Sequence, residues 1–147
     1  MKKIYSKQDP EKLLHIICRK DELGLHNKPE GGRVDVAPEN QLLQVAAIQM
    51  NTGKTFKPHR HIWKDGEKNV IVQESWVVLS GSVRATLYDL DDSILGEEQL
   101  TPGDLSLTFE GGHNYMATES NTFVYEFKTG PYKGIENDKT FIERSST

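Results

Sequence analysis

The sequence predicts an all-β domain built from two antiparallel sheets. From Gln41 onward, apolar and polar residues alternate with a period of two in several short segments, which is typical of strands with one buried face. Turn-forming residues separate these segments at short intervals, as in the run Pro102-Gly103-Asp104. The length of 147 residues fits one domain with a core of ordinary size. Together these features favour a sandwich or a small barrel, of which the jelly roll is one standard form.

The N-terminal part, residues 1–40, is expected to pack on the barrel. Asp9 and Pro10 resemble a helix start, because aspartate caps exposed amides and proline suits the first turn. Apolar residues at helical spacing follow, namely Leu13, Leu14, Ile17 and Cys18. We therefore predict a short α-helix that ends near Lys20. The segment 27–40 contains two prolines and a Gly-Gly pair, which indicates a connection with at most a short edge strand at residues 33–37.

The barrel itself is expected over residues 41–130, with a polar C-terminal tail over 131–147 in the same domain. A mostly apolar strand is predicted first, at 41–50. The later strands are predicted from alternation or from apolar runs that end in turns, at 74–80, 83–88, 105–109 and 123–128.

Composition excludes several classes of function. The 18 basic and 22 acidic residues give a formal net charge of -4 without long runs, which argues against a nucleic-acid partner or a polybasic membrane surface. Cys18 is the only cysteine, so no intramolecular disulfide can form, and residues 1–12 lack the apolar stretch of a secretory signal. No apolar run has the length of a membrane span. We therefore expect a cytoplasmic protein.

Four residues stand out as candidate metal ligands. His59 and His61 are two apart, so both imidazoles project from one face of an extended segment. Glu74 opens the next strand, and His113 follows far downstream. Three imidazoles and one carboxylate suit one divalent transition metal, such as iron, manganese, nickel or zinc, better than calcium or magnesium.

The neighbours of Glu74 strengthen this interpretation. By a period of two, Val72, Trp76 and Val78 share its face. An ionised carboxylate on such an apolar face is costly to bury unless a cation or a hydrogen-bond donor meets it. A metal ion would supply that cation.

These residues resemble the motifs of the cupins. The first cupin motif is a His-X-His, a later glutamate and a glycine seven residues after it, matched here by His59, His61, Glu74 and Gly81. The second is a Pro-Gly turn, a strand and a histidine, matched by Pro102-Gly103 and His113. The twelve residues between His61 and Glu74 form a longer insert than in a typical cupin.

The chain is more narrowly similar to small cupin-fold metalloproteins of the WbuC type, which are associated with bacterial surface polysaccharide biosynthesis. The similar segments are PHRH, ESWVVLSG, VYEFKTGPY and a later DKTF. This resemblance implies a cupin-type jelly-roll barrel with the four residues as metal ligands, a homodimer, and a small-molecule ligand such as a sugar or sugar-nucleotide.

Three functions remain open on the sequence. The first is a metal-dependent enzyme on a sugar derivative, such as an isomerase, an epimerase or an oxygenase. The second is a metal-independent sugar-nucleotide ketoisomerase or epimerase, in which His59 or His61 transfers protons. The third is a sugar- or metal-binding module without catalysis. Side chains that could contact the ligand are Trp76, Arg84, Tyr125 and Lys128.

Overall fold

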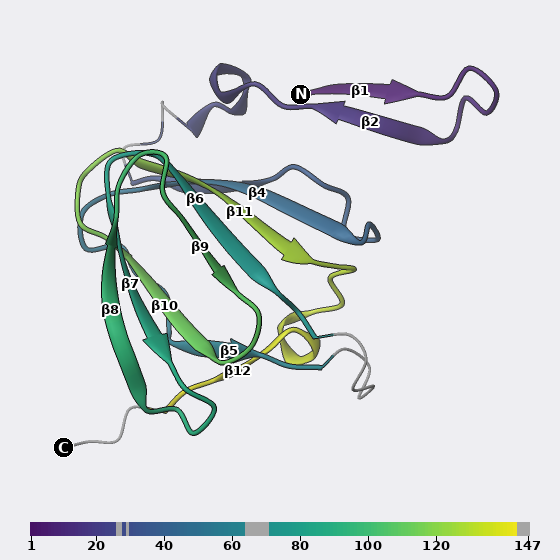
Figure 1. Ribbon diagram of the computed structural model, residues 1–147. Helices are drawn as coiled ribbons and strands as arrows, with labels where there is room; N and C mark the ends of the chain where they lie inside the picture. The colour runs from purple at the N-terminus through teal and green to yellow at the C-terminus, as the bar shows by residue number, and fades with distance from the viewer. Residues whose placement is uncertain (26–27, 29, 64–70, 144–147) are drawn as a thin grey trace.

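Two five-stranded antiparallel sheets face each other in the computed structural model, which describes residues 1–25, 28, 30–63 and 71–143 (Figure 1). The first, called the β5 sheet, has the order β12 (Lys139–Phe141), β5 (His59–His61), β10 (Gly112–Ala117), β7 (Val83–Tyr88) and β8 (Ile94–Leu100). The second, called the β6 sheet, has the order β3 (Gly32–Asp35), β4 (Leu43–Met50), β11 (Thr122–Thr129), β6 (Glu74–Ser80) and β9 (Leu105–Thr108). The all-β class and the antiparallel double sheet are confirmed.

The hydrophobic core lies between the two sheets. Trp76 of the β6 sheet stacks on Tyr115 of the β5 sheet, with ring centroids 4.3 Å apart. Both rings are almost fully buried, and such aromatic pairs stabilise a core beyond the area that they bury. Aliphatic side chains fill the rest of the space, among them Ile48, Met50, Val78, Val83 and Val124.

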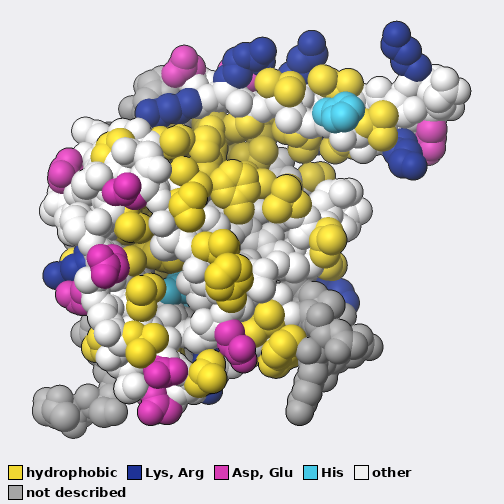
Figure 2. Space-filling model, viewed as in Figure 1, with side chains coloured by type: hydrophobic (Ala, Val, Ile, Leu, Met, Phe, Trp, Pro, Cys, Tyr) yellow, Lys and Arg dark blue, Asp and Glu magenta, His cyan; other side chains and the backbone are white. Residues whose placement is uncertain are grey.

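A second apolar cluster covers the outer face of the β6 sheet near its β3 edge. Phe123 of β11 points outward there and packs against Leu23 and Leu25, which belong to or follow the short 3-10 helix η1 (Lys20–Leu23). The same outer face is open elsewhere, because Leu105 and Leu107 of β9 are 57% and 49% exposed. Figure 2 shows hydrophobic side chains gathered over this part of the molecule.

The predicted N-terminal α-helix is wrong. Residues 13–17 form β2 (Leu13–Ile17), which pairs with β1 (Lys2–Tyr5) in a separate antiparallel hairpin (Figure 1). Asp9 does cap backbone amides, but within a turn: its Oδ1 accepts the amide of Glu11, and Ser6 Oγ accepts the amide of Asp9 itself. The pattern LLHII also suits a strand, since isoleucine is β-branched.

Both sheets reach beyond the range 41–130 expected for the barrel. β3 pairs with β4 at one end of the chain. At the other end, the 3-10 helix η4 (Ile135–Asn137) leads into β12, which pairs with β5. Within the described residues, no helix has the length and hydropathy needed to cross a membrane.

Gly81 turns the chain from the β6 sheet into the β5 sheet. Its φ of +71° lies in the left-handed region that glycine adopts without strain. A Cβ at this position would lie 2.7 Å from Thr122 Cα, so the backbone of β11 leaves no room for a side chain. The glycine of the first cupin motif is thus explained by the packing of this turn.

Candidate metal centre

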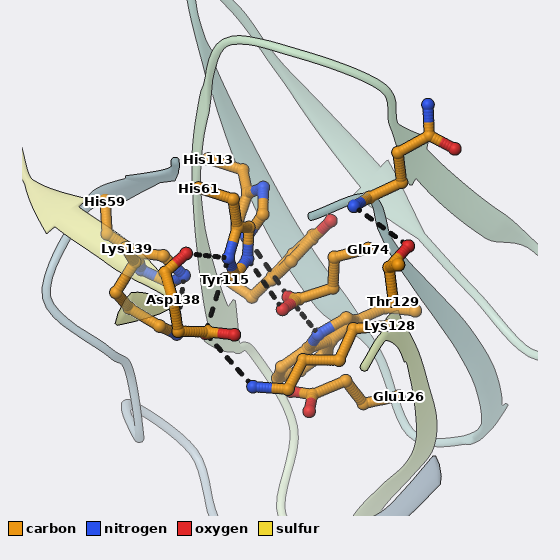
Figure 3. A network of polar contacts seen from close by, with 12 residues as sticks. His59, His61, Glu74, His113, Tyr115, Glu126, Lys128, Thr129, Asp138 and Lys139 are labelled. Carbon is orange, nitrogen blue, oxygen red and sulfur yellow. Dashed lines mark hydrogen bonds and ion pairs between the residues drawn. The ribbon is translucent and has the colours of Figure 1, made fainter. Parts of the chain in front are cut away.

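The four predicted ligands converge between the two sheets (Figure 3). His59 and His61 lie on β5, and the register of the sheet sets His113 of β10 directly beside His59. Glu74, at the start of β6, reaches them from the opposite sheet. All four side chains are buried, and one potential ligand atom from each lies within 4.8 Å of the others.

Hydrogen bonds orient two of the imidazoles for metal binding. His59 Nδ1 lies 2.9 Å from the carbonyl oxygen of Lys57, and His61 Nδ1 lies 3.0 Å from that of Asp138. Because a carbonyl only accepts hydrogen bonds, each Nδ1 must carry the proton and donate it. In the neutral ring, Nε2 then presents its lone pair to the centre of the cluster, as in metal-binding histidines.

Glu74 sits where it would meet a cation. Its Oε2 lies 2.9 Å from His61 Nε2, and its Oε1 accepts a hydrogen bond of 3.0 Å from Trp76 Nε1. Two lone pairs would face each other between Oε2 and a neutral His61, which is unfavourable in a buried site. A proton or a metal ion between these atoms removes the repulsion.

His113 provides a second sign of a missing cation. It is completely buried, and neither of its ring nitrogens makes a hydrogen bond within the described residues. Its Nε2 lies 3.1 Å from Glu74 Oε1, which is close enough for an ion pair but is not a well-directed hydrogen bond. Buried polar nitrogens rarely lack a partner, and a metal ion would provide one. The donor set present therefore fits a divalent transition metal.

The local electrostatics keep His59 neutral and Glu74 ionised, the forms that bind a metal. Burial, together with repulsion from the neighbouring Lys139 and His113, lowers the pKa of His59 to about 3, so this ring is neutral at ordinary pH. Burial opposes the charge on Glu74, but its contacts with His113 and His61 outweigh that cost and hold its pKa well below its usual value. Burial likewise opposes protonation of His61, whereas hydrogen bonds with Asp138 and Glu74 raise its pKa.

Two charged side chains beside the histidines, Asp138 and Lys139, were not predicted as site residues from the sequence. Asp138 Oδ2 lies 3.1 Å from Lys128 Nζ and 3.4 Å from His61 Nδ1. Lys139 Nζ lies 3.0 Å from His59 Nε2 (Figure 3). Asp138 and Lys139 belong to a polar segment that resembles an exposed tail, and only the pairing of β12 with β5 brings them to the site. The DKTF similarity was the one sequence signal for this segment.

A cavity of about 230 Å³ opens beside the cluster. Of the four predicted ligand contacts, Trp76 and Lys128 line this cavity, together with His59, Glu74 and Lys139. Arg84 is exposed on β7 and lies 3.9 Å from Glu97, and Tyr125 points to the outer apolar cluster beside Phe123. The structure therefore brings two of the four to the cavity.

Solved structures with the same fold were found by structural comparison, although no protein-family model and no curated protein matches the sequence. An uncharacterised Klebsiella pneumoniae protein with a double-stranded β-helix domain has a TM-score of 0.62 at 18% identity, with 89% of this chain and 100% of that chain covered. KdgF from Halomonas sp. has a TM-score of 0.54 at 20% identity, with 72% of this chain and 84% of that chain covered.

A third similar structure is CapF from Staphylococcus aureus, a capsular polysaccharide assembling protein. Its TM-score is 0.62 at 17% identity, with 78% of this chain covered. The chain spans only 32% of CapF, so it corresponds to about a third of that protein. At such identities the similarity concerns the fold. With its two facing antiparallel sheets and these structural neighbours, the protein has the cupin fold, the double-stranded β-helix.

Proposed function

We propose that the protein is a metal-binding cupin that acts on a small sugar derivative. The observation that carries this proposal is the convergence of inward-facing Nε2 atoms of His59 and His61 on the carboxylate of Glu74. Such an arrangement is unfavourable when empty and favourable around a cation. His113 would be the fourth ligand.

The metal would be one divalent ion of iron, manganese, nickel or zinc, held by His59, His61, Glu74 and His113. When bound, it would polarise a carbonyl or hydroxyl oxygen of the ligand as a Lewis acid. Four protein ligands leave one or two positions open in a five- or six-coordinate ion, as catalytic metals require and closed structural sites do not.

The cavity supports a small ligand. Its volume of about 230 Å³ lies below the roughly 300 to 1,000 Å³ of typical pockets for drug-sized ligands, which suits a ligand near the size of a monosaccharide. The nucleotide part of a sugar-nucleotide would have to lie outside it. The sugar class and a role in polysaccharide biosynthesis are supported by the similarity in fold to CapF and by the resemblance to WbuC-type proteins.

The electrostatics argue against the metal-independent alternative. A general acid or base works best when its pKa is near the working pH. The pKa of His59 is lowered to about 3, so this ring would hardly ever be protonated at neutral pH. His61 Nδ1 is bound to the carbonyl oxygen of Asp138, its Nε2 faces Glu74, and His61 is not among the residues that line the cavity.

Metal analysis of protein purified without added metal tests the proposal. We expect close to one transition-metal ion per chain in the wild type and almost none in a His59→Ala, His61→Ala double variant that remains folded. The metal-loaded wild type is then screened for thermal shift and turnover with sugars and sugar-nucleotides. Full metal retention by the double variant would exclude this site, and metal binding without any turnover would favour the binding-module function.

We also propose that the protein is a homodimer. The β1–β2 hairpin projects beside the sheets and exposes Tyr5, Leu14 and Ile17, although an isolated two-stranded hairpin is marginally stable in water. The outer face of the β6 sheet exposes Leu105 and Leu107. A second copy that docks its hairpin on this face would bury both surfaces by the same symmetric contact. Light scattering should give twice the mass of 16.7 kDa for the wild type and a lower mass for a Leu105→Lys, Leu107→Lys variant.

A further inference from the structure

The charges around the cavity are divided between its deep end and its rim. At the deep end, Lys128 and Lys139 both approach one carboxylate, since their Nζ atoms lie 3.1 and 3.8 Å from Asp138 Oδ2. The side chains of Lys128 and Lys139 are 9% and 18% exposed, and that of Asp138 is 1% exposed. One carboxylate, that of Asp138, therefore lies within 4 Å of both ammonium groups, while the buried carboxylates of Glu74 and Glu126 attract Lys139 from farther away.

The carboxylates at the rim are engaged elsewhere or face solvent. Glu126 forms an ion pair with Arg33, in which Oε1 lies 2.7 Å from Nη2. Arg33 also pairs with Asp35, with 2.8 Å between Nε and Oδ1. The side chain of Asp35 is 63% exposed, and Glu39 is also exposed. Water screens such exposed charges far more than it screens buried ones. Asp35 and Glu39 therefore compensate the deep lysines only weakly, and the buried carboxylate of Glu126 is already paired with Arg33.

Lys139 would lose its closest partner when the metal site is filled. Its Nζ is 3.0 Å from His59 Nε2, the atom whose lone pair would go to the metal. The next acceptor, Asp138 Oδ2, is 3.8 Å away, beyond hydrogen-bond distance, and is already bound to Lys128. The metal adds two positive charges, of which Glu74 offsets one. A filled site would therefore leave a buried excess of positive charge and unused ammonium donors facing the cavity.

We propose that the ligand carries an anionic oxygen group, which binds the Lys139 ammonium next to the metal. This inference rests on the metal site proposed above and narrows its ligand class from sugars in general to small hydroxylated acids. A carboxylate or phosphate would offset the excess charge and take up the free donors of Lys139. A neutral sugar would leave that charge uncompensated in a buried site, which is costly.

Binding of three probes to Co²⁺-loaded protein tests this inference: D-glucuronate, D-glucose 6-phosphate and D-glucose. Calorimetry gives the affinities, and the visible spectrum of Co²⁺ reports entry of a ligand beside the metal. We expect at least one of the two acids to bind roughly tenfold or more tightly than glucose. Whichever acid binds more tightly identifies the carboxylate or the phosphate as the anionic group. Equal affinity for glucose and both acids, or no binding of either acid, would overturn the inference.

Three variants identify Lys139 as the contact. Lys139→Met should weaken binding of the preferred acid roughly tenfold or more, and Lys139→Arg should retain most of the affinity because it keeps the charge. Lys12→Met removes an exposed lysine far from the cavity and should bind like the wild type. Unchanged acid binding by folded Lys139→Met would refute the role of Lys139.

The metal content separates this outcome from a failure of the metal site. Lys139 is not a ligand, so Lys139→Met should hold as much Co²⁺ as the wild type while it loses the acid. Absence of Co²⁺ from the wild type would instead refute the proposed function. If Lys139→Met does not fold, the affinities of the wild type for the three probes still decide. A wild type that binds neither acid more tightly than glucose contradicts the inference directly.

Discussion

The indole N–H of Trp76 positions Glu74 as well as filling the core. It donates a hydrogen bond of 3.0 Å to Glu74 Oε1, while the ring stacks on Tyr115. Partners of this kind fix the orientation of a metal-binding carboxylate, and their loss typically weakens metal affinity by about 10- to 100-fold.

We therefore predict that Trp76→Phe lowers metal affinity by about 10- to 100-fold, since phenylalanine keeps an aromatic ring and loses the donor. Competition with a chromophoric chelator measures this change. Trp63→Phe serves as the control, because Trp63 is 38% exposed and does not line the cavity. Equal affinities for the two variants would show that the indole hydrogen bond has no influence on the metal.

The convergence of the four candidate ligand residues could be predicted from sequence because their signal is local. His59 and His61 share a face by strand periodicity, and Glu74 is conspicuous because apolar residues surround it on its own strand. Lys139 gives no comparable signal. It reaches the site through the pairing of Lys139 with His61 across two strands that are far apart in the chain, and no periodicity in either strand encodes that partnership.

At the scale of elements, the turn at Gly81 provides a sharp test of how the sheets are joined. Gly81→Ala should lower the unfolding free energy by about 3 kcal/mol, through the left-handed backbone and through overlap with β11. Gly53→Ala is a matched control, because Gly53 has a φ of +81° but nothing within 4 Å of its Cβ position. It should cost only about 1 kcal/mol. Urea unfolding of both variants separates the two contributions, and equal losses would mean that the contact with Thr122 is relieved without cost.

The strands were largely predictable, whereas the N-terminal element was not. In strands such as β7 and β11, side chains of different type alternate with a period of two. An amphipathic helix, with its period of 3.6 residues, does not produce this pattern. The apolar residues of the segment 13–17 fit the three- to four-residue spacing of a helix as well as the pattern of a strand. Its state is decided by pairing with Lys2–Tyr5, a partner that local propensity does not reveal. The part of the long insert at 64–70 lies outside the described residues.

For the molecule as a whole, the buried His59 makes stability depend on pH in the absence of metal. The pKa of His59 is about 3 in the folded protein and near 6.5 in an unfolded chain. Between these values the unfolded state binds more protons, so the unfolding free energy should fall as the pH falls from about 6.5 to 3.

Urea unfolding of chelator-treated protein across this pH range measures the effect. His59→Asn cannot titrate and should show a shallower decline of the unfolding free energy toward low pH. His15→Asn removes an exposed histidine on β2 and should follow the wild type. A decline as steep in His59→Asn as in the wild type would assign the acid sensitivity to other groups.

The pairing of β12 with β5 also bears on when the proposed metal site can form during synthesis. β5 lies between β10 and β12, so the strand that carries His59 and His61 gains one of its two neighbours only from residues 139–141. The carbonyl that orients His61 belongs to Asp138 in the same segment. A chain still growing on the ribosome therefore contains the three histidines and Glu74 before it contains the strand that pairs with β5. We expect tight metal uptake only after residues 138–141 have emerged from the ribosome and β12 has paired with β5.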